Sequence, residues 1–139
     1  MPIAKEFKIS LEDRPGTLGK LCQALADQRV HILAFQSFPL DKGKSSVHLV
    51  LDNPAVAKTV LDCQRTEYTE TEVAKVTLVH RPGELARAAS RLGEVGININ
   101  YSYCGVPPGT NATILFFGVA EADKAVKLFE QAAAASSTT

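Results

Sequence analysis

Two short segments of the chain place residues suited to anion binding at the start of a helix. Residues 13–18 read Asp-Arg-Pro-Gly-Thr-Leu, and residues 80–85 read His-Arg-Pro-Gly-Glu-Leu. Proline fixes the backbone and lacks an N–H group, whereas glycine accepts unusual backbone angles. The amides that follow Gly16 and Gly83 then lie at a helix N-terminus, which attracts a carboxylate or another anion. The alternative is a plain turn whose helix cap is satisfied within the chain.

The candidate ligand-binding residues are the polar residue that enters each turn, the helix-start residues, and one polar residue after each helix. They are Asp13, Gly16, Thr17, Leu18 and His31 in the first segment, and His80, Gly83, Glu84, Leu85 and Asn98 in the second. His31 and Asn98 each precede an isoleucine at the expected start of a strand. At that position a polar side chain is either exposed to solvent or within reach of a ligand's amino group or carboxylate.

The two turns belong to an internal repeat. Position 80 follows position 13 by 67 residues, and the same offset, without gaps, matches identical residues along the chain. The matches are Lys8 with Lys75, Leu11 with Leu78, Leu25 with Leu92 and Ile32 with Ile99. The chain is therefore predicted to contain two copies of one unit, at 1–72 and 73–139.

The first copy is predicted to fold as strand, helix, strand, strand, helix, strand. Phe7, Ile9 and Leu11 alternate with Glu6, Lys8, Ser10 and Glu12, which indicates a strand with one face exposed to water. A helix with apolar residues at helical spacing follows the turn. Strands are expected at about 31–38, 45–51 and 67–71, with a hairpin loop at 41–44. A second helix is expected to start at Asn53 as N-cap and Pro54.

The second copy repeats this order as far as its second helix. Strands are expected around Val76 and Leu78, at about 97–104 and at about 111–119. The helices are expected before Gly96 and at about 121–134. The residues after the last helix, at about 134–139, are too small and polar for a core strand, so the second unit is predicted to lack its fourth strand. The fold class is α+β, with two ferredoxin-like βαββαβ units that place both helices on one face of an antiparallel sheet.

The composition excludes several classes of protein. The 15 Lys and Arg residues balance the 15 Asp and Glu residues, which argues against a nucleic-acid partner and a membrane-surface role. No apolar run approaches the ~20 residues of a spanning helix, and the first residues lack the apolar core of a signal peptide, so we expect a cytoplasmic protein. Cys22, Cys63 and Cys104 form no C-x-x-C pair and are expected to be small core side chains.

The repeated segments resemble the ACT domain, a family of small-molecule sensors, most often for amino acids. The phrases DRPGTLGKLCQALADQRVHI and HRPGELARAASRLGEVGININ carry the resemblance, which covers nearly the whole chain as a tandem pair with no catalytic domain. It implies that the domains pair side by side, and that an amino acid binds between paired domains against the first turn and the second strand. It also implies an enzyme of amino-acid metabolism as partner. Asp13 and His31 stand where the family has Asn, so the two sites are not equivalent.

We therefore predict a non-catalytic, amino-acid-binding regulatory protein that needs no cofactor and forms a homodimer. One alternative is a structural oligomerisation or partner-binding module without a ligand. Another is an acylphosphatase-like enzyme, in which Arg81 and Asn98 would bind an anion, but the phosphate-cradling loop of that family is absent. The histidines His31, His48 and His80 show no spacing typical of a metal site.

Overall fold

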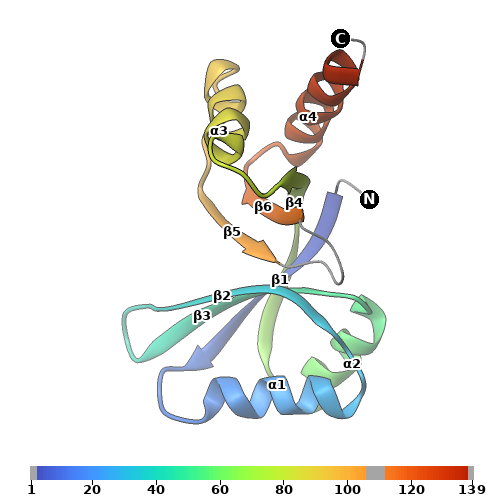
Figure 1. Ribbon diagram of the computed structural model, residues 1–139. Coiled ribbons are helices and arrows are strands. Elements are labelled where there is room, and N and C mark those ends of the chain that lie inside the picture. Colours follow the sequence, from blue (N-terminus) through green and yellow to red (C-terminus); the bar gives the residue numbers. More distant parts are fainter. Residues whose placement is uncertain (1–2, 106–111, 138–139) are drawn as a thin grey trace. The chain divides into compact units, whose positions relative to one another are not determined.

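The computed structural model describes residues 3–105 and 112–137 of the chain (Figure 1). The helices and strands follow the predicted order, except that the last strand of the first copy and the first strand of the second are a single strand. The elements are β1 (Ile3–Glu12), α1 (Thr17–Asp27), β2 (Ile32–Pro39), β3 (Lys44–Leu51), α2 (Pro54–Cys63), β4 (Glu67–Val79), α3 (Glu84–Glu94), β5 (Tyr101–Gly105), β6 (Ala112–Gly118) and α4 (Ala122–Ser137).

The chain divides into two compact units. The first unit comprises Lys5–Thr71, and the second comprises the described residues of Met1–Ala4 and Glu72–Thr139. Both units combine helices with antiparallel strands, so the α+β class is confirmed.

Three strands of the first unit form an antiparallel sheet with β3 in the middle. Phe7 of β1 lies opposite Leu49 of β3, and Gln36 of β2 lies opposite His48 on the other side of β3. The start of β4 lies beside β1, because the rings of Tyr68 and Phe7 meet edge to face with centroids 5.8 Å apart. The unit therefore contains all six elements predicted for the first copy.

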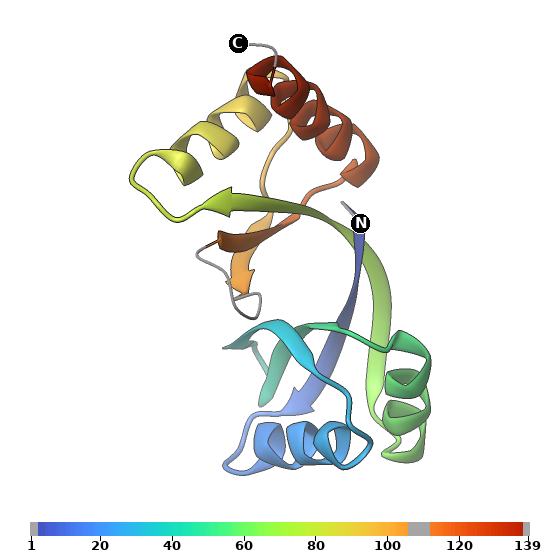
Figure 2. The ribbon, with the colours of Figure 1, turned by 45° about the vertical axis from the view of Figure 1, so that its right-hand side comes forward.

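Helices α1 and α2 cover one face of this sheet (Figure 2). A buried cluster joins Leu21 and Leu25 of α1 and Leu61 of α2 to Phe7 and Ile9 of β1. Apolar residues three to four apart on a helix, and two apart on a strand, point to the same side of their element. The spacing of apolar residues thus predicted correctly which sides of α1, α2 and β1 face this cluster.

The second unit has a comparable sheet and helix pair. Both β4 and β5 pair with β6 in antiparallel fashion. Its core combines Leu92 of α3, Phe117 of β6 and Phe129 of α4. Ile3, at the beginning of β1, packs against this cluster. Among the described residues no strand follows α4, and Ile3 with Ala4 supplies extended chain to this unit instead.

The strand pairing locates a one-residue insertion in the repeat. Ile9 lies opposite Val47 in the first unit, whereas Val76, which is 67 residues after Ile9, lies opposite Leu115. Leu115 follows Val47 by 68 residues. The offset of 67 therefore holds for the turns and first helices, and one extra residue precedes β6.

Three expected boundaries differ from the structure. The expected strand at 67–71 and the first strand of the second copy are one uninterrupted strand, β4, because residues 72–74 contain no Gly or Pro to break it. The strand expected at about 97–104 begins only at Tyr101. Helix α4 continues to Ser137, so the tail expected to be irregular from about 134 is helical to that residue. Residues 106–111, between the strands expected at about 97–104 and 111–119, lie outside the described residues.

The predicted start of α2 and the predicted end of α3 are confirmed. Asn53 caps α2 by accepting a hydrogen bond from the backbone N–H of Val56 at 3.3 Å, and Pro54 opens that helix. Gly96 follows α3 with a φ of 76°, a left-handed conformation that glycine adopts at little cost. Both signals are local, so they could be identified without the tertiary structure.

Two cysteines do not lie where the sequence suggested. Cys63 and Cys104 are exposed, whereas Cys22 is half-buried and burial raises the pKa of its thiol. All three are free thiols. No helix in the described part of the chain is long and apolar enough to cross a membrane.

Candidate functional site

The two strand-to-helix turns are built alike. Gly16 and Gly83 both have a φ of 91°, with ψ angles of −15° and −14°. In each turn the amide three residues after the arginine donates weakly back to the arginine carbonyl, at 3.4 Å. Helices α1 and α3 begin directly after these glycines, and neither helix start has a side-chain cap. The first backbone N–H groups of both helices therefore have no acceptor within their own helix.

A cavity of about 360 Å³ opens beside the turn of the first unit. We call it the turn cavity, and its wall comes from β1, α1, β3 and the chain that leads from α2 into β4. Four cations line it: Arg14, Lys20, Lys44 and Arg65. The remaining lining residues are Ser10, Leu11, Glu12, Thr17, Leu21, Gln64, Thr66 and Glu67.

The charges of the turn cavity are not balanced. The Nε of Arg14 donates to Oε2 of Glu12 at 2.6 Å, which forms an exposed pair. Lys20, Lys44 and Arg65 have no ion pair or side-chain hydrogen bond with any residue that the structure describes. The cavity thus presents three cations without an ion pair among the described residues, close to the positive end of α1, where a bound anion is stabilised by both.

The corresponding place in the second unit already holds a carboxylate. Glu84, the first residue of α3, accepts hydrogen bonds from Nε of Arg81 at 2.6 Å and from Nη1 of Arg87 at 3.1 Å. Its side chain is only 13% exposed. The hydrogen bond from Arg81, more than any other contact, holds the pKa of Glu84 below its ordinary value. A smaller cavity of about 170 Å³ remains beside Glu84 and Arg87.

Other turn residues have structural partners. The backbone N–H of Asp13 donates to the carbonyl of Gly43 at 2.8 Å, which fixes the end of β1 on the β2–β3 hairpin. The side-chain oxygen of Thr113 lies 3.5 Å from Nδ1 of His80. Leu18 packs against the core of its unit, whereas the corresponding Leu85 is 54% exposed.

His31 and Asn98 lie apart from the turns within their own units. Each follows the end of a helix of 11 residues, which is about 16 Å long, whereas the turn precedes that helix. Neither residue lies in a strand, contrary to expectation, because β2 begins at Ile32 and β5 at Tyr101. The backbone N–H of His31 donates to Asp52 at 2.8 Å, and the side chain of Asn98 donates to Asn100 at 3.1 Å.

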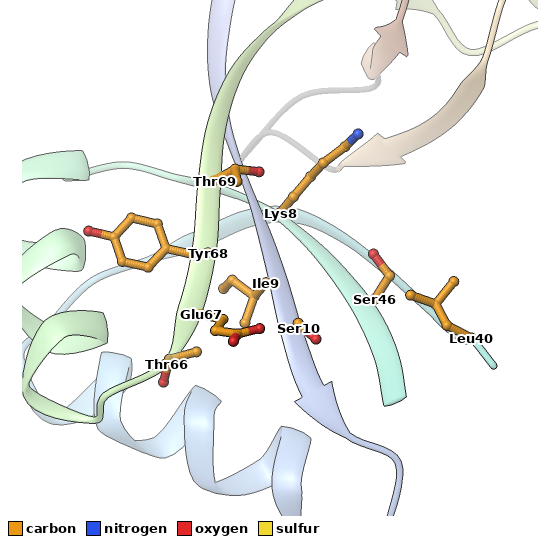
Figure 3. A pocket seen from close by; sticks show the side chains of 9 residues that line it. All are labelled: Lys8, Ile9, Ser10, Leu40, Ser46, Thr66, Glu67, Tyr68 and Thr69. Carbon is orange, nitrogen blue, oxygen red and sulfur yellow. The ribbon is translucent and has the colours of Figure 1, made fainter. Parts of the chain in front are cut away.

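A second, larger cavity of about 540 Å³ lies in the first unit, and Figure 3 shows the side chains around it. We call it the sheet-face cavity. Lys8 and Ser10 come from β1, Ser46 from β3 and Leu40 from the β2–β3 hairpin. Ile9, Thr66, Glu67, Tyr68 and Thr69 complete the wall. Ser10, Thr66 and Glu67 also line the turn cavity, so the two cavities adjoin.

The sheet-face cavity was not anticipated from the sequence. The alternation in β1 predicts that Lys8 and Ser10 face water, and the sequence predicts only a short strand at 67–71. The signal that was available is the concentration of hydroxyl groups in residues 66–71. The hydroxyl of Tyr68 is not directed to this cavity, since it donates to Asp62 at 3.0 Å. This hydrogen bond raises the pKa of Tyr68.

No model of a protein family matches the sequence, and no curated protein matches it either. Solved structures do match. A Bacteroides thetaiotaomicron protein aligns with 94% of this chain and 88% of its own, with a TM-score of 0.82 and 21% identity. The regulatory subunit of aspartate kinase from Thermus thermophilus aligns with 94% of this chain and 91% of its own, with a TM-score of 0.64 and 19% identity.

A third match is to part of a larger enzyme. Aspartate kinase from Synechocystis matches 94% of this chain over 25% of its own length, with a TM-score of 0.64 and 22% identity. These likenesses show the fold. The fold of this chain is similar to that of regulatory subunits of aspartate kinase, which supports the expected ACT-like architecture.

Proposed function

We propose that this chain is a non-catalytic, cytoplasmic regulatory protein that binds an amino acid and acts on an enzyme of amino-acid metabolism. Its two ACT-like domains would correspond to residues 1–72 and 73–139, each a ferredoxin-like unit. The likeness in fold to regulatory subunits of aspartate kinase supports the proposal, because those subunits serve an enzyme named for its amino-acid substrate.

The turn cavity is the observation that carries this proposal. It combines a helix start without a side-chain cap, three cations without an ion pair among the described residues, and the carboxylate of Glu67 beside the Arg14–Glu12 pair. An amino acid offers a carboxylate and an ammonium group, and this wall contains acceptors and donors for both. Its volume of about 360 Å³ lies within the range of small-molecule sites.

The decisive experiment is isothermal titration of the full chain against the twenty amino acids. We expect heat from at least one of them. Lys44→Gln should weaken binding of that ligand about tenfold, because the loss of a charge-assisted bond removes roughly 1.5 kcal/mol. Lys127→Gln, on the exposed side of α4, removes the same charge elsewhere and should leave the affinity unchanged. Folded protein that binds none of the twenty contradicts the proposal.

The sheet-face cavity provides a second location for the same ligand. Ser46 lines this cavity but not the turn cavity. Ser46→Leu should therefore fill the sheet-face cavity and leave binding at the turn intact. Loss of binding in Ser46→Leu, together with full binding in Lys44→Gln, would move the proposed site to the sheet face.

We also propose that the chain forms a homodimer. Leu33, Phe35 and Leu40 lie along β2 and its hairpin, and 40%, 55% and 50% of their respective surfaces are exposed. Contact with a second copy would remove this apolar surface from water. Phe35→Ser should lower the mass measured by light scattering to that of one chain. A dimer that persists unchanged with every amino acid, and binds none, favours the alternative of a ligand-free oligomerisation module.

A further inference from the structure

The repeat allows the two turns to be compared residue by residue. At the offset of 67, Arg14 corresponds to Arg81 and Lys20 corresponds to Arg87. Both units therefore place two cations around the start of their first helix. The residue between them differs, since the second unit has Glu84 where the first unit has Thr17. The two turns thus differ by one carboxylate, that of Glu84, which the first unit lacks.

In the second unit this carboxylate binds both cations. Glu84 accepts from Arg81 at 2.6 Å and from Arg87 at 3.1 Å, and it is largely buried between them. Acidic residues are favourable in the first turn of a helix for the same reason that bound anions are. The carboxylate of Glu84 thus marks the position at which an anion binds between two such cations at a helix start.

In the first unit no carboxylate from the start of the helix occupies the corresponding position. The hydroxyl of Thr17 donates to the carbonyl of Glu12 at 2.8 Å, with the carbonyl of Arg14 at 3.1 Å, so it completes the turn without adding charge. No acidic residue lies in the first turn of α1. The cavity here measures about 360 Å³, against about 170 Å³ beside Glu84.

The cavities correspond in their walls as well as in their turns. Ser10, Leu11, Thr17, Lys20 and Leu21 line the first, and their counterparts at the offset of 67, namely Thr77, Leu78, Glu84, Arg87 and Ala88, line the second. The first cavity has further cations in Lys44 and Arg65. Its four cations face two carboxylates, those of Glu12 and Glu67, so its wall carries a formal excess of positive charge.

We propose that the turn cavity of the first unit binds an acidic amino acid, with one of its carboxylates in the place that Glu84 occupies in the second unit. Glu84 keeps the second turn closed to such ligands, so one chain binds one ligand. The wall selects for negative charge because it offers more cations than a neutral zwitterion can compensate. This inference rests on the proposed function only in taking the ligand to be an amino acid.

The test compares ligands that differ in charge but not in shape. L-glutamate and L-aspartate should bind the full chain at least tenfold more tightly than L-glutamine and L-asparagine, with one site per chain in isothermal titration. Inorganic phosphate, titrated separately, distinguishes a carboxylate site from a general anion site. Equal affinity for L-glutamate and L-glutamine overturns the inference but leaves the proposed function standing, whereas the absence of binding by any amino acid overturns both. Binding of phosphate alone also overturns the assignment.

Two exchanges between the copies sharpen this test. Thr17→Glu makes residues 14–18 identical to residues 81–85, which fold in the second unit, and the new carboxylate should reduce L-glutamate affinity at least tenfold. Thr17→Gln, of the same size but uncharged, should reduce it much less. Glu84→Thr should raise the number of L-glutamate sites from one to two per chain. Equal losses in Thr17→Glu and Thr17→Gln would show that bulk and not charge blocks the cavity, and would overturn the inference.

Discussion

Oε1 of Glu6 lies 3.2 Å from Nδ1 of His48, and the exposed fractions of the two side chains are 0% and 4%. Glu6 is on β1 and His48 on β3, two adjacent strands of the first unit. Both alternate with residues of the apolar cluster under α1 and α2, so they lie on the opposite face of the sheet. A carboxylate withdrawn from water is costly unless a partner compensates its charge or its hydrogen bonds.

Removing one member of this pair should destabilise the protein strongly. Glu6→Ala is expected to lower the free energy of unfolding by about 3 kcal/mol, because the buried imidazole loses its contact with the Glu6 carboxylate. Glu12→Ala, on the exposed end of the same strand, should change it by less than about 0.5 kcal/mol. Urea denaturation of both variants measures the difference. Similar midpoints for the two variants would contradict a role for the buried pair.

The glycines of the turns are required for their backbone conformation and not for lack of space. An added Cβ at Gly16 or Gly83 would meet no atom within 4 Å, but both residues have a φ of 91°. Gly16→Ala and Gly83→Ala should each lower the free energy of unfolding by about 1 kcal/mol or more, since side chains disfavour this region. Thermal unfolding of the two variants measures the cost.

Gly19 supplies the matched control inside the chain. It lies in α1, its added Cβ would also meet open space, and its φ is not left-handed. Gly19→Ala should therefore stabilise the protein by roughly 0.5–1 kcal/mol, because alanine favours helix. If Gly16→Ala and Gly19→Ala shift the melting temperature in the same direction, the explanation from backbone angles fails.

Local and periodic signals explain how much of the fold could be predicted. The repeat located both turns, period-two and helical spacing located the buried faces, and Asn53 with Pro54 located the start of α2. These features depend on neighbouring residues, or on residues at one fixed offset. They were sufficient for the element order and for Gly16, Thr17, Gly83 and Glu84 at the helix starts.

The features that failed depend on tertiary contacts. The alternation of Glu6 with Phe7 predicts that Glu6 faces water, yet its side chain is fully buried. Lys44 and Arg65 reach the turn cavity from segments far from the turn in sequence, so no spacing rule identifies them. The sequence also does not reveal that β4 is a single strand. Two consecutive strands and one long strand have the same local sequence pattern when no turn residue separates them.

Tyr101 covers Gly118 in the sheet of the second unit. The two residues lie opposite each other on β5 and β6, and a Cβ added to Gly118 would collide with the tyrosine ring. Gly118→Ala should therefore lower the free energy of unfolding by about 1–3 kcal/mol through overpacking. Combining it with Tyr101→Ala removes the collision, so the double variant should be more stable than the sum of the two single losses predicts. If the losses of stability in the two single variants simply add in the double variant, the proposed collision is contradicted.

Two carboxylates should make stability depend on pH below neutrality. The hydrogen bond from Arg81 lowers the pKa of Glu84, and the hydrogen bond from Lys58, aided by Lys5, lowers the pKa of Glu70, in both cases from an ordinary value of 4.5. The unfolded chain therefore binds protons more readily at both sites, and the stabilisation is complete above about pH 4.5. It is lost as the pH falls through the lower folded pKa values.

Melting temperatures measured from pH 7 to pH 3 test this expectation. Glu84→Gln and Glu70→Gln should each flatten the decline below about pH 4.5, because the glutamine binds no proton in either state. Glu94→Gln is the matched control, since Glu94 lies at the other end of α3 and forms no ion pair with the described residues. A decline that all three variants share with the parent would assign the acid sensitivity to other groups.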